Sequence, residues 1–513
     1  MHQFPMTCRL TAMLRRQRPG PGLAPLAGLS SLARAAHHKS KPLVVDGDTI
    51  RPMATPSQFY ETLVGAIGSA RSSVSISSLY IGTGEHERRL LSAASSCVAP
   101  VHAVMDATRG RRPHPSPSPE EFFTAQLGEG SVRLLDHPAA GWLPRRYFGK
   151  GRLREGGGTH HAKVYAADDW ACVSGANLSE EYFCGRQDRY LEMRHAGLAG
   201  LYHGVVGMLV ASPGRGAVLA GEERARLREG MGDLLAEATA HGVPAAGDGG
   251  VPVSLAWQCG VLGLRDDEER VLSVLAATGA GASVDIATGY CNMPDFVVDA
   301  LAAAAARGAA VRVLTASPAA NGFLGARGIP AALPLGYSFL LRRIARRLRQ
   351  AGVLREPAAG DPSTAGVAGR VLLVEWTHPN DHGWALPREG PAGVGMEPPD
   401  EASGPARRTF HAKGLWVTGD DGSVLTAAGS SNFGRRSFDI DLELQTWVGP
   451  VPAGSATAEA LEGERAALFD GEAAVPVGLR QLESRERSVG PTLWAKDTGL
   501  WVEAAAVVLR PWM

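Results

Sequence analysis

Apolar residues in the first quarter of the chain switch between helical and strand spacing. Phe59, Leu63 and Ile67 recur every four residues, which predicts a helix, and Thr55-Pro56 before them supplies an N-cap and a first helical residue. The nearly continuous run VSISSLYI that follows is typical of a buried strand. The expected elements here are a helix opened by Pro56, a strand over 74–81, a helix over 85–94 and a strand over 101–105.

The same order of elements returns in the second half. The pattern predicts a helix over 266–277, a strand over 284–290, an Ala-rich helix opened by Pro over 294–307 and a strand over 311–315. A repeated helix–strand–helix–strand series indicates an internal duplication. Helices that alternate with buried strands predict an α/β layered fold.

Each series leads to a segment with the same polar pattern. The first, over 159–177, reads THHAKVYAADDWACVSGAN, and the second, over 410–432, reads FHAKGLWVTGDDGSVLTAAGSSN. His161 and Lys163 lie two residues apart in a strand-like run, so their side chains are expected on one side, and His411 and Lys413 repeat this spacing. A single copy is also compatible with a stray histidine at a solvated strand edge, but two copies are unlikely to arise by chance and indicate a functional site.

The residue types suit chemistry at phosphorus. A neutral imidazole is a nucleophile, while a fixed ammonium and an Asn amide, here Asn177 and Asn432, stabilise phosphoryl oxygens. Asp168 completes the first copy, whereas the second copy has Thr418 at that place, with Asp420 two residues later. Whether Asp420 takes over the missing role stays open.

The pattern H-x-K-x4-D followed by Gly and Asn resembles the phospholipase D superfamily. The resemblance implies two tandem lobes related by a pseudo-twofold axis, each a mostly parallel sheet between helix layers, with the two motifs facing one active site. It also implies a carboxylate after each motif that binds the far nitrogen of a catalytic imidazole. Glu443 fits that role, and its counterpart is Glu192 or Asp188.

Three short sequence segments resemble one branch of this superfamily, the eukaryotic phosphatidylglycerophosphate synthases. They are SLYIGTG, GANLSEEYF after the first motif, and HAKGLW in the second. The resemblance implies transfer of a phosphatidyl group from CDP-diacylglycerol to glycerol 3-phosphate, an early step of cardiolipin biosynthesis, with no cofactor. We expect His161 to be the nucleophile, His411 the general acid and base, and no metal to be required, because two His, two Lys and two Asn supply the chemistry.

Two further features bear on substrate binding. Gly82-Thr83-Gly84 follows a strand and opens a helix, where backbone N–H groups favour a phosphate, although an ordinary tight turn explains it equally well. The segment over 337–353 reads YSFLLRRIARRLRQAGV, a basic amphipathic helix. It suits peripheral contact with an anionic membrane, or a core-packed helix with a solvated basic face.

Composition narrows the class further. Lys+Arg and Asp+Glu are both 52, so no global basic field favours nucleic acid. The six Cys form no C-x-x-C pair, which speaks against a zinc cluster or a disulfide scaffold. No run of 18 apolar residues exists to span a membrane.

The N-terminal 41 residues contain no acidic residue and are rich in Arg and Ser, which is typical of a mitochondrial transit peptide. We expect cleavage between Arg34 and Lys41, and a peripheral protein on the matrix side of the inner membrane. The remaining predicted units are a first lobe over 42–242, a linker over 243–252, a second lobe over 253–480 and an extension over 481–513. A Pro/Gly-rich stretch over 387–406 is a candidate lid.

Other functions remain open at this stage. The chain could be a cardiolipin synthase-like transferase, or a phosphodiesterase acting on lipid or nucleic acid. Because the second motif lacks its Asp, a non-catalytic lipid-binding protein is a further alternative.

Overall fold

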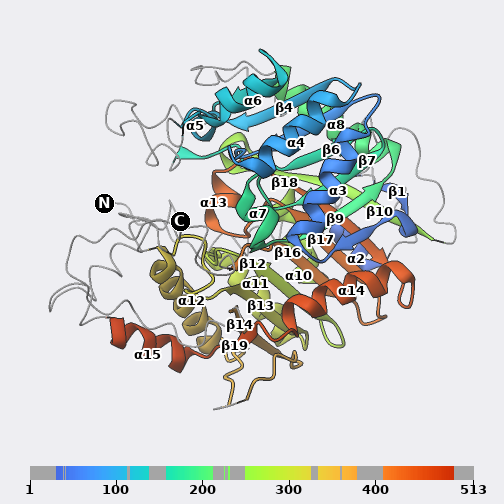
Figure 1. Ribbon diagram of the computed structural model, residues 1–513. Helices are drawn as coiled ribbons and strands as arrows, with labels where there is room; N and C mark the ends of the chain where they lie inside the picture. Colours follow the sequence, from blue (N-terminus) through green and yellow to red (C-terminus); the bar gives the residue numbers. More distant parts are fainter. Residues whose placement is uncertain are drawn as a thin grey trace, which may run out of the picture.

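The computed structural model describes residues 30–37, 40, 42–112, 116–137, 157–211, 225, 229–230, 249–324, 333–358, 361–377 and 408–489. Two sheets dominate the molecule, one built mainly from the first half of the chain and the other mainly from the second (Figure 1). Helices cover both sheets, so the α/β prediction is confirmed. The candidate lid over 387–406 lies outside the described residues.

The first sheet has seven strands in the order β2-β9-β7-β6-β3-β4-β5. Only β3, β4 and β5 run parallel to one another, and the other neighbours are antiparallel. The strands are β2 (Arg51–Met53), β3 (Val74–Ser78), β4 (Val101–Asp106), β5 (Val132–Leu135), β6 (Val164–Ala167), β7 (Trp170–Ser174) and β9 (Tyr190–Arg194).

The second sheet has ten strands in the order β1-β10-β18-β17-β16-β12-β13-β14-β19, with β11 paired to β10. Here β12, β13 and β14 are the parallel group. The strands are β1 (Leu43–Asp46), β10 (Gly250–Cys259), β11 (Leu264–Arg265), β12 (Ser283–Thr288), β13 (Ala310–Ala316), β14 (Arg370–Trp376), β16 (Gly414–Thr418), β17 (Val424–Gly429), β18 (Glu443–Val451) and β19 (Ala474–Pro476).

The two sheets repeat one topology. The order β9-β7-β6-β3-β4-β5 in the first matches β18-β17-β16-β12-β13-β14 in the second. This confirms the duplication and the tandem lobes, but the sheets are mixed rather than mostly parallel. The reason is that each motif strand turns back directly into the next, β6 into β7 and β16 into β17, and a tight hairpin makes its strands antiparallel.

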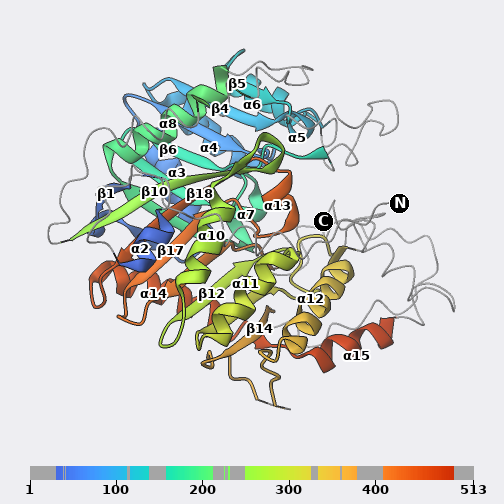
Figure 2. The same cartoon turned by 180° about the vertical axis from the view of Figure 1, so that it is seen from behind.

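Helices form where the sequence places caps and apolar stripes. Thr55 caps α3, its hydroxyl accepting from Gln58 N–H at 3.2 Å, with Pro56 in the first turn. In the second lobe α10, α11 and α12 lie along one face of the sheet (Figure 2). The helices are α2 (Ser31–Ala36), α3 (Pro56–Gly68), α4 (Glu85–Ser96), α5 (Ala107–Gly110), α6 (Pro119–Leu127), α7 (Glu180–Cys184), α8 (Ala196–Ala211), α10 (Asp266–Ala277), α11 (Asp295–Ala306), α12 (Leu333–Gln350), α13 (Arg435–Asp439), α14 (Ala456–Phe469) and α15 (Leu479–Val489), with 3-10 turns η1 (Gly47–Thr49) and η3 (Gly260–Leu262).

The lobes share one apolar core. Side chains of β6, β7, β9 and α8 pack with those of β10 and β18 in a single cluster, for example Val173 and Leu191 with Leu444 and Val448. A shared core fixes the position of one lobe relative to the other, which a site assembled from both lobes requires.

Three elements pack or pair across predicted boundaries. Helix α2 lies within the supposed transit segment, yet it packs against α10 and β18, and Leu32 and Ala36 are buried in the second lobe's core. Strand β10 starts at Gly250, inside the supposed linker, and pairs with β1 of the supposed first lobe. Helix α15 crosses the boundary at residue 480 and packs on α12. Each boundary was placed by composition, which does not report tertiary pairing.

Candidate active site

The two H-x-K motifs lie just before β6 and β16, which hold equivalent places in the two sheets. Strand β6 starts at Val164 and β16 at Gly414, so each His and Lys occupies the extended segment that leads into its strand. Lys163 Nζ donates to the backbone oxygen of His161 at 2.8 Å, and Lys413 Nζ donates to that of His411 at the same distance. The spacing therefore brings each ammonium back over its own histidine.

His161 takes its carboxylate partner from the other lobe. Its Nδ1 lies 2.8 Å from Oε2 of Glu443, at the start of β18. The other oxygen of Glu443 accepts from Ser437 Oγ at 2.7 Å, which fixes the carboxylate. Within the described residues the Nε2 atom of His161 has no hydrogen-bond partner, and the side chain keeps 12 % of its surface exposed. The contact with Glu443 thus leaves Nε2 as the ring nitrogen without a hydrogen bond among the described residues.

His411 is held in the mirrored way. Its Nδ1 lies 2.5 Å from Oδ2 of Asp188, which belongs to the first lobe. Of the two predicted counterparts of Glu443, Asp188 is the one that contacts a motif histidine, and Glu192 does not. Glu192 lies on β9 and instead accepts from Trp170 Nε1 at 3.0 Å, on a different part of the first lobe.

The backbone repeats this crossed arrangement. His161 N–H donates to Leu442 O at 2.9 Å, and His411 N–H donates to Gln187 O at 2.8 Å. The segments form matching short parallel pairings, His160 with Leu442 and β15 (Thr409–Phe410) with β8 (Arg186–Gln187). A pseudo-twofold relation between the two halves of the site accounts for both sets of contacts.

Burial and neighbouring charges set the protonation of the histidines. Burial lowers the pKa of His161, and the adjacent Glu443 opposes this. Burial lowers the pKa of His411 further, and Lys413 and Arg186 add to that shift. Both imidazoles are therefore neutral in the resting protein, and a neutral imidazole is the form that attacks phosphorus.

The two carboxylates shift their pKa values in opposite directions, whereas both lysines have a lowered pKa. Burial would raise the pKa of Glu443, but the contacts with His161 and Lys163 outweigh it and lower the pKa to about 2. Burial raises the pKa of Asp188 to about 6 against the pull of Lys413. Burial also lowers the pKa of Lys163 to about 7 and that of Lys413 to about 8. An incoming anion would reverse the lysine shifts, because an opposite charge favours the charged form.

Aromatic side chains enclose His411, and sequence reasoning missed them. The Tyr182 hydroxyl lies 3.3 Å from His411 Nε2 and accepts from Asn177 Nδ2 at 3.1 Å. The rings of Tyr182 and Tyr290 meet the imidazole edge-on, with centroids 5.0 and 5.4 Å away. Asn177 is thus tied to the site through Tyr182. Asn432 accepts at its backbone oxygen from Thr288 Oγ1 and donates its N–H to Ser437, the residue that holds Glu443.

Asp168 lies elsewhere. It occupies the turn between β6 and β7 with a φ of 52°, and its carboxylate accepts from the backbone N–H groups of Arg71, Ser72 and Ser73 at 2.8–3.0 Å. Its predicted catalytic role does not fit this position, because the carboxylate anchors the α3–β3 loop. The equivalent position of the second motif is also structural. There the Thr418 hydroxyl donates to Glu462 on α14 at 2.7 Å, and Asp420 is exposed.

The Gly82-Thr83-Gly84 turn is already filled by a side chain of the protein. A Cβ at Gly82 would lie 2.3 Å from Oε1 of the buried Glu87, and one at Gly84 would lie 2.9 Å from its other oxygen. Glu87 also accepts from Glu180 N–H at 2.5 Å. A carboxylate therefore takes the place predicted for phosphate at the start of α4.

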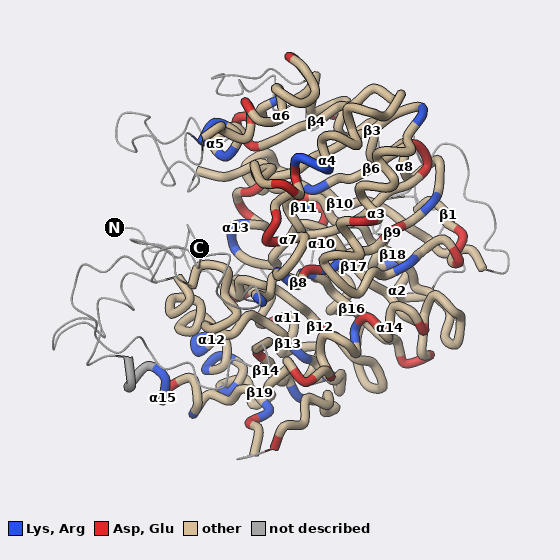
Figure 3. The backbone as a smooth tube through the Cα atoms, viewed as in Figure 1, with Lys and Arg blue, Asp and Glu red and all other residues tan. Residues whose placement is uncertain are grey.

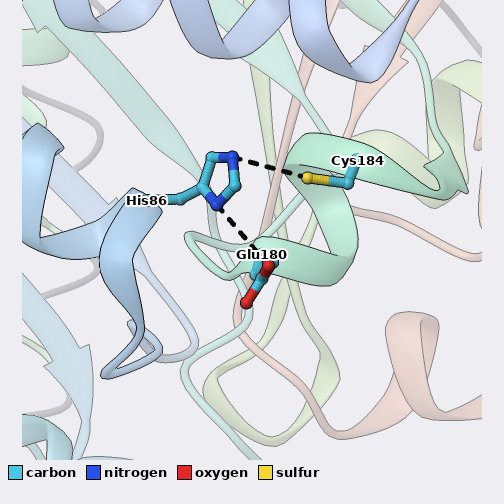
Figure 4. Close-up of side chains that lie close together, drawn as sticks. All are labelled: His86, Glu180 and Cys184. Carbon is cyan, nitrogen blue, oxygen red and sulfur yellow. Dashed lines mark hydrogen bonds and ion pairs between the residues drawn. The ribbon is translucent and has the colours of Figure 1, made fainter. Parts of the chain in front are cut away.

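A small cluster of potential ligands lies on the outer side of α7. His86 Nδ1 is 3.6 Å from Glu180, and its Nε2 is 3.6 Å from Cys184 Sγ, so the two neighbours approach opposite nitrogens of one ring (Figure 4). Within the described residues this is the one group with the composition of a metal site. The two contacts use different edges of the imidazole and link α4 to α7.

The basic helix is α12, and acidic neighbours neutralise much of it. Arg343 pairs with Asp295, Arg347 with Asp299 at 2.5 Å, and Arg346 with Glu483 of α15. Figure 3 shows basic positions, in blue, along α12, which packs against both α11 and α15. The arrangement favours the core-packed alternative over a membrane-binding face. In the described part of the chain no helix has the length and hydropathy needed to cross a bilayer.

The sequence is similar to a family model and to several named enzymes. Residues 275–452 match a family model described as "Cardiolipin synthase, PLD-like domain". Mitochondrial CDP-diacylglycerol–glycerol-3-phosphate 3-phosphatidyltransferases from Pongo abelii and Homo sapiens are each 27% identical over 88% of this chain and 82% of theirs. The corresponding enzyme of Saccharomyces cerevisiae is 28% identical over 76% of each chain.

A solved structure shares the fold. A phosphatidylserine synthase from Haemophilus influenzae superposes with a TM-score of 0.65 at 17% identity, covering 94% of this chain and all of that one. At this identity the likeness speaks for the fold alone. The coverage of nearly the whole chain agrees with the two tandem lobes described above.

Proposed function

We propose that this chain, which carries a phospholipase D-like domain, is a phosphatidyltransferase that moves a phosphatidyl group from CDP-diacylglycerol to glycerol 3-phosphate and releases CMP. The product, phosphatidylglycerophosphate, lies on the route to cardiolipin. The relatives that cover most of the chain carry that name in mammals, birds and yeasts. The observation that carries the proposal is the pair of imidazoles, each buttressed by a carboxylate from the opposite lobe.

In the first step His161 attacks the diacylglycerol-linked phosphorus through Nε2. Glu443 accepts the Nδ1 proton in a hydrogen bond, so it fixes the tautomer that leaves Nε2 as the nucleophile and stabilises the cation that forms. The bond from phosphorus to the CMP oxygen breaks, and CMP leaves with a proton from His411. A phosphatidyl-histidine remains.

His411 must be protonated to act as this acid, although burial keeps its pKa low in the free protein. The diphosphate of CDP-diacylglycerol brings negative charge beside it, and this charge raises the pKa of an imidazole. Asp188 holds the Nδ1 proton of His411, so the gained proton resides on Nε2, the nitrogen that faces Tyr182.

In the second step neutral His411 takes the proton from a glycerol 3-phosphate hydroxyl. The resulting oxygen attacks the phosphorus, the bond to His161 breaks, and phosphatidylglycerophosphate leaves. Lys163 and Lys413, with the amides of Asn177 and Asn432, supply positive charge and N–H donors to the phosphoryl oxygens in both steps. No step consumes a cofactor.

We place the protein on a mitochondrial membrane surface, at the matrix side of the inner membrane. The naming of the mammalian relatives as mitochondrial supports the organelle. The acyl chains of CDP-diacylglycerol stay in a bilayer, so the mouth of the site has to reach the lipid surface. Flotation of the protein with anionic vesicles tests this, and recovery of all protein in the lipid-free fraction would refute it.

The decisive assay supplies CDP-diacylglycerol and labelled glycerol 3-phosphate to the full chain. We expect labelled phosphatidylglycerophosphate and equimolar CMP, with His161→Ala abolishing both and the surface variant His102→Ala retaining both. CMP release that does not depend on glycerol 3-phosphate would point instead to a phosphodiesterase. Absence of any product from folded protein would favour a lipid-binding role.

A further inference from the structure

An arginine stands next to the site without a role in the chemistry above. Arg186 on β8 is only 8 % exposed, and its guanidinium lies over the Tyr182 ring at 4.7 Å. Its Nε donates to Thr409 Oγ1 at 3.1 Å, two residues before His411. The stacking and the hydrogen bond hold the flat group in one orientation.

One terminal nitrogen of Arg186, Nη2, approaches the same place as a tyrosine hydroxyl. A Cβ built on Gly322 would lie 2.9 Å from Arg186 Nη2 and 3.1 Å from the Tyr290 hydroxyl, so both polar groups reach the same backbone position. Tyr290 also packs its ring against His411. The charge of Arg186 is close enough to lower the pKa of His411. A guanidinium and a phenol thus approach one place on the His411 side of the site.

The carboxylate partner of Arg186 is unusual for a buried arginine. Nη2 pairs with Glu181 at 2.7 Å, but the Glu181 side chain is 63 % exposed against 10 % for Arg186. Arg189, three residues later, pairs with Glu464 with exposures of only 1 % and 9 %, as expected of a structural ion pair between the lobes. An exposed carboxylate is readily displaced by a stronger anion, because moving it into water costs little.

We propose that Arg186, assisted by Tyr290, binds a phosphate monoester on the His411 side of the site and that Glu181 occupies this place until the ligand arrives. The inference rests on the proposed function, in which two phosphate monoesters visit this side: leaving CMP and incoming glycerol 3-phosphate. A guanidinium fork suits a phosphate dianion, which it binds through two parallel hydrogen bonds. The acceptor's phosphate takes no part in bond making, so a separate group has to position it.

The test compares Arg186→Gln and Arg186→Lys with Arg194→Gln, an exposed arginine at the far end of β9. Losing the charge-assisted bonds should raise the KM for glycerol 3-phosphate roughly 10- to 100-fold, with a smaller change for Lys. The preference for glycerol 3-phosphate over glycerol should fall by a similar factor, since glycerol lacks the phosphate. Arg194→Gln should behave like the unchanged protein.

A second arm identifies the source of the phosphate. Weaker product inhibition by CMP in Arg186→Gln, with an unchanged KM for glycerol 3-phosphate, assigns the subsite to the nucleotide and still supports the proposal. Unchanged values for both ligands, or a lower kcat alone, overturn it. If the unchanged protein makes no phosphatidylglycerophosphate at all, it is the proposed function that fails.

Glu181→Gln provides a test that does not depend on correct folding of the arginine variants. Because Glu181 is largely exposed, its replacement should leave the fold intact while removing the competitor for Arg186. We expect its KM for glycerol 3-phosphate, or its inhibition constant for CMP, to fall several-fold. A rise in both constants would contradict a displaceable carboxylate.

Discussion

Each motif histidine contacts a carboxylate from the other half of the chain. Glu443 lies 11 residues after Asn432, and Asp188 lies 11 residues after Asn177. This equal offset was a signal in the sequence that singles out Asp188 over Glu192. The histidines and lysines were predictable because their spacing is repeated. Tyr182 and Tyr290 were not, because a buried aromatic residue has the same pattern whether it packs in a core or against an imidazole.

Removing the Glu443 charge should slow the reaction without unfolding the protein. Glu443→Gln keeps the shape but loses a charge-assisted hydrogen bond, worth roughly 10- to 100-fold in kcat. Pre-steady-state release of CMP is the proper measurement, because the loss belongs to the attack by His161. Glu192→Gln, whose carboxylate only meets Trp170, serves as the control and should keep its burst of CMP. Equal loss in both variants would contradict the crossed pairing.

The buried lysines give the reaction an alkaline limit. With the pKa of Lys163 at about 7 and that of Lys413 at about 8, these groups lose their positive charge as pH rises through that range. Since kcat/KM reports the free enzyme, its value for CDP-diacylglycerol should fall above about pH 7. Saturating lipid should move the limit upward, because bound diphosphate favours the ammonium form. A flat profile to pH 9 would contradict neutralisation by these lysines.

At the scale of elements, the long amphipathic patterns were predictable and their partners were not. The helix over 266–277 forms with the predicted bounds, because four acidic residues open it and an apolar stripe covers one face. The antiparallel hairpins that make the sheets mixed follow from tight turns, which a resemblance to a fold family does not specify. The basic face of α12 had the expected periodicity, but the acids that pair with it come from α11 and α15.

Asp168 is a structural residue of the β6–β7 turn, so its loss should affect stability rather than chemistry. Asp168→Ala removes the acceptor for three backbone N–H groups and leaves Ala at a positive φ, costing about 1–2 kcal/mol of unfolding free energy. Asp168→Asn, which tolerates that φ, should cost less. Denaturant unfolding measures the difference. A large fall in kcat with unchanged stability would restore a catalytic role.

At the scale of the molecule, the segment that contains α2 packs against the second lobe. His37 is fully buried, its ring bonding to Ser254 Oγ at 2.7 Å and to Gly449 O at 2.6 Å, and Leu32 is buried beside it. Composition predicted a leader here because the segment lacks acidic residues. Only the folded structure shows that part of it, α2, completes the second lobe.

This arrangement predicts where the chain tolerates shortening. The chain without residues 1–29 is the reference for the unfolding free energy, because it keeps α2 and its N-cap Ser30. Deleting residues 1–41 removes the buried Leu32 and His37 and should lower it by at least about 2 kcal/mol. Unfolding in urea distinguishes the two. Equal stability of both truncated chains would show that α2 adds nothing to the second lobe.

The central claim is that two imidazoles from different lobes act in turn on one phosphorus, with His161 forming the covalent bond. The most direct test is to quench the full chain at alkaline pH during turnover of labelled CDP-diacylglycerol without acceptor, and to map the label by mass spectrometry. The account predicts phosphatidyl on His161, chased into phosphatidylglycerophosphate when glycerol 3-phosphate is added. Label on His411, or turnover without any label on the protein, would contradict it.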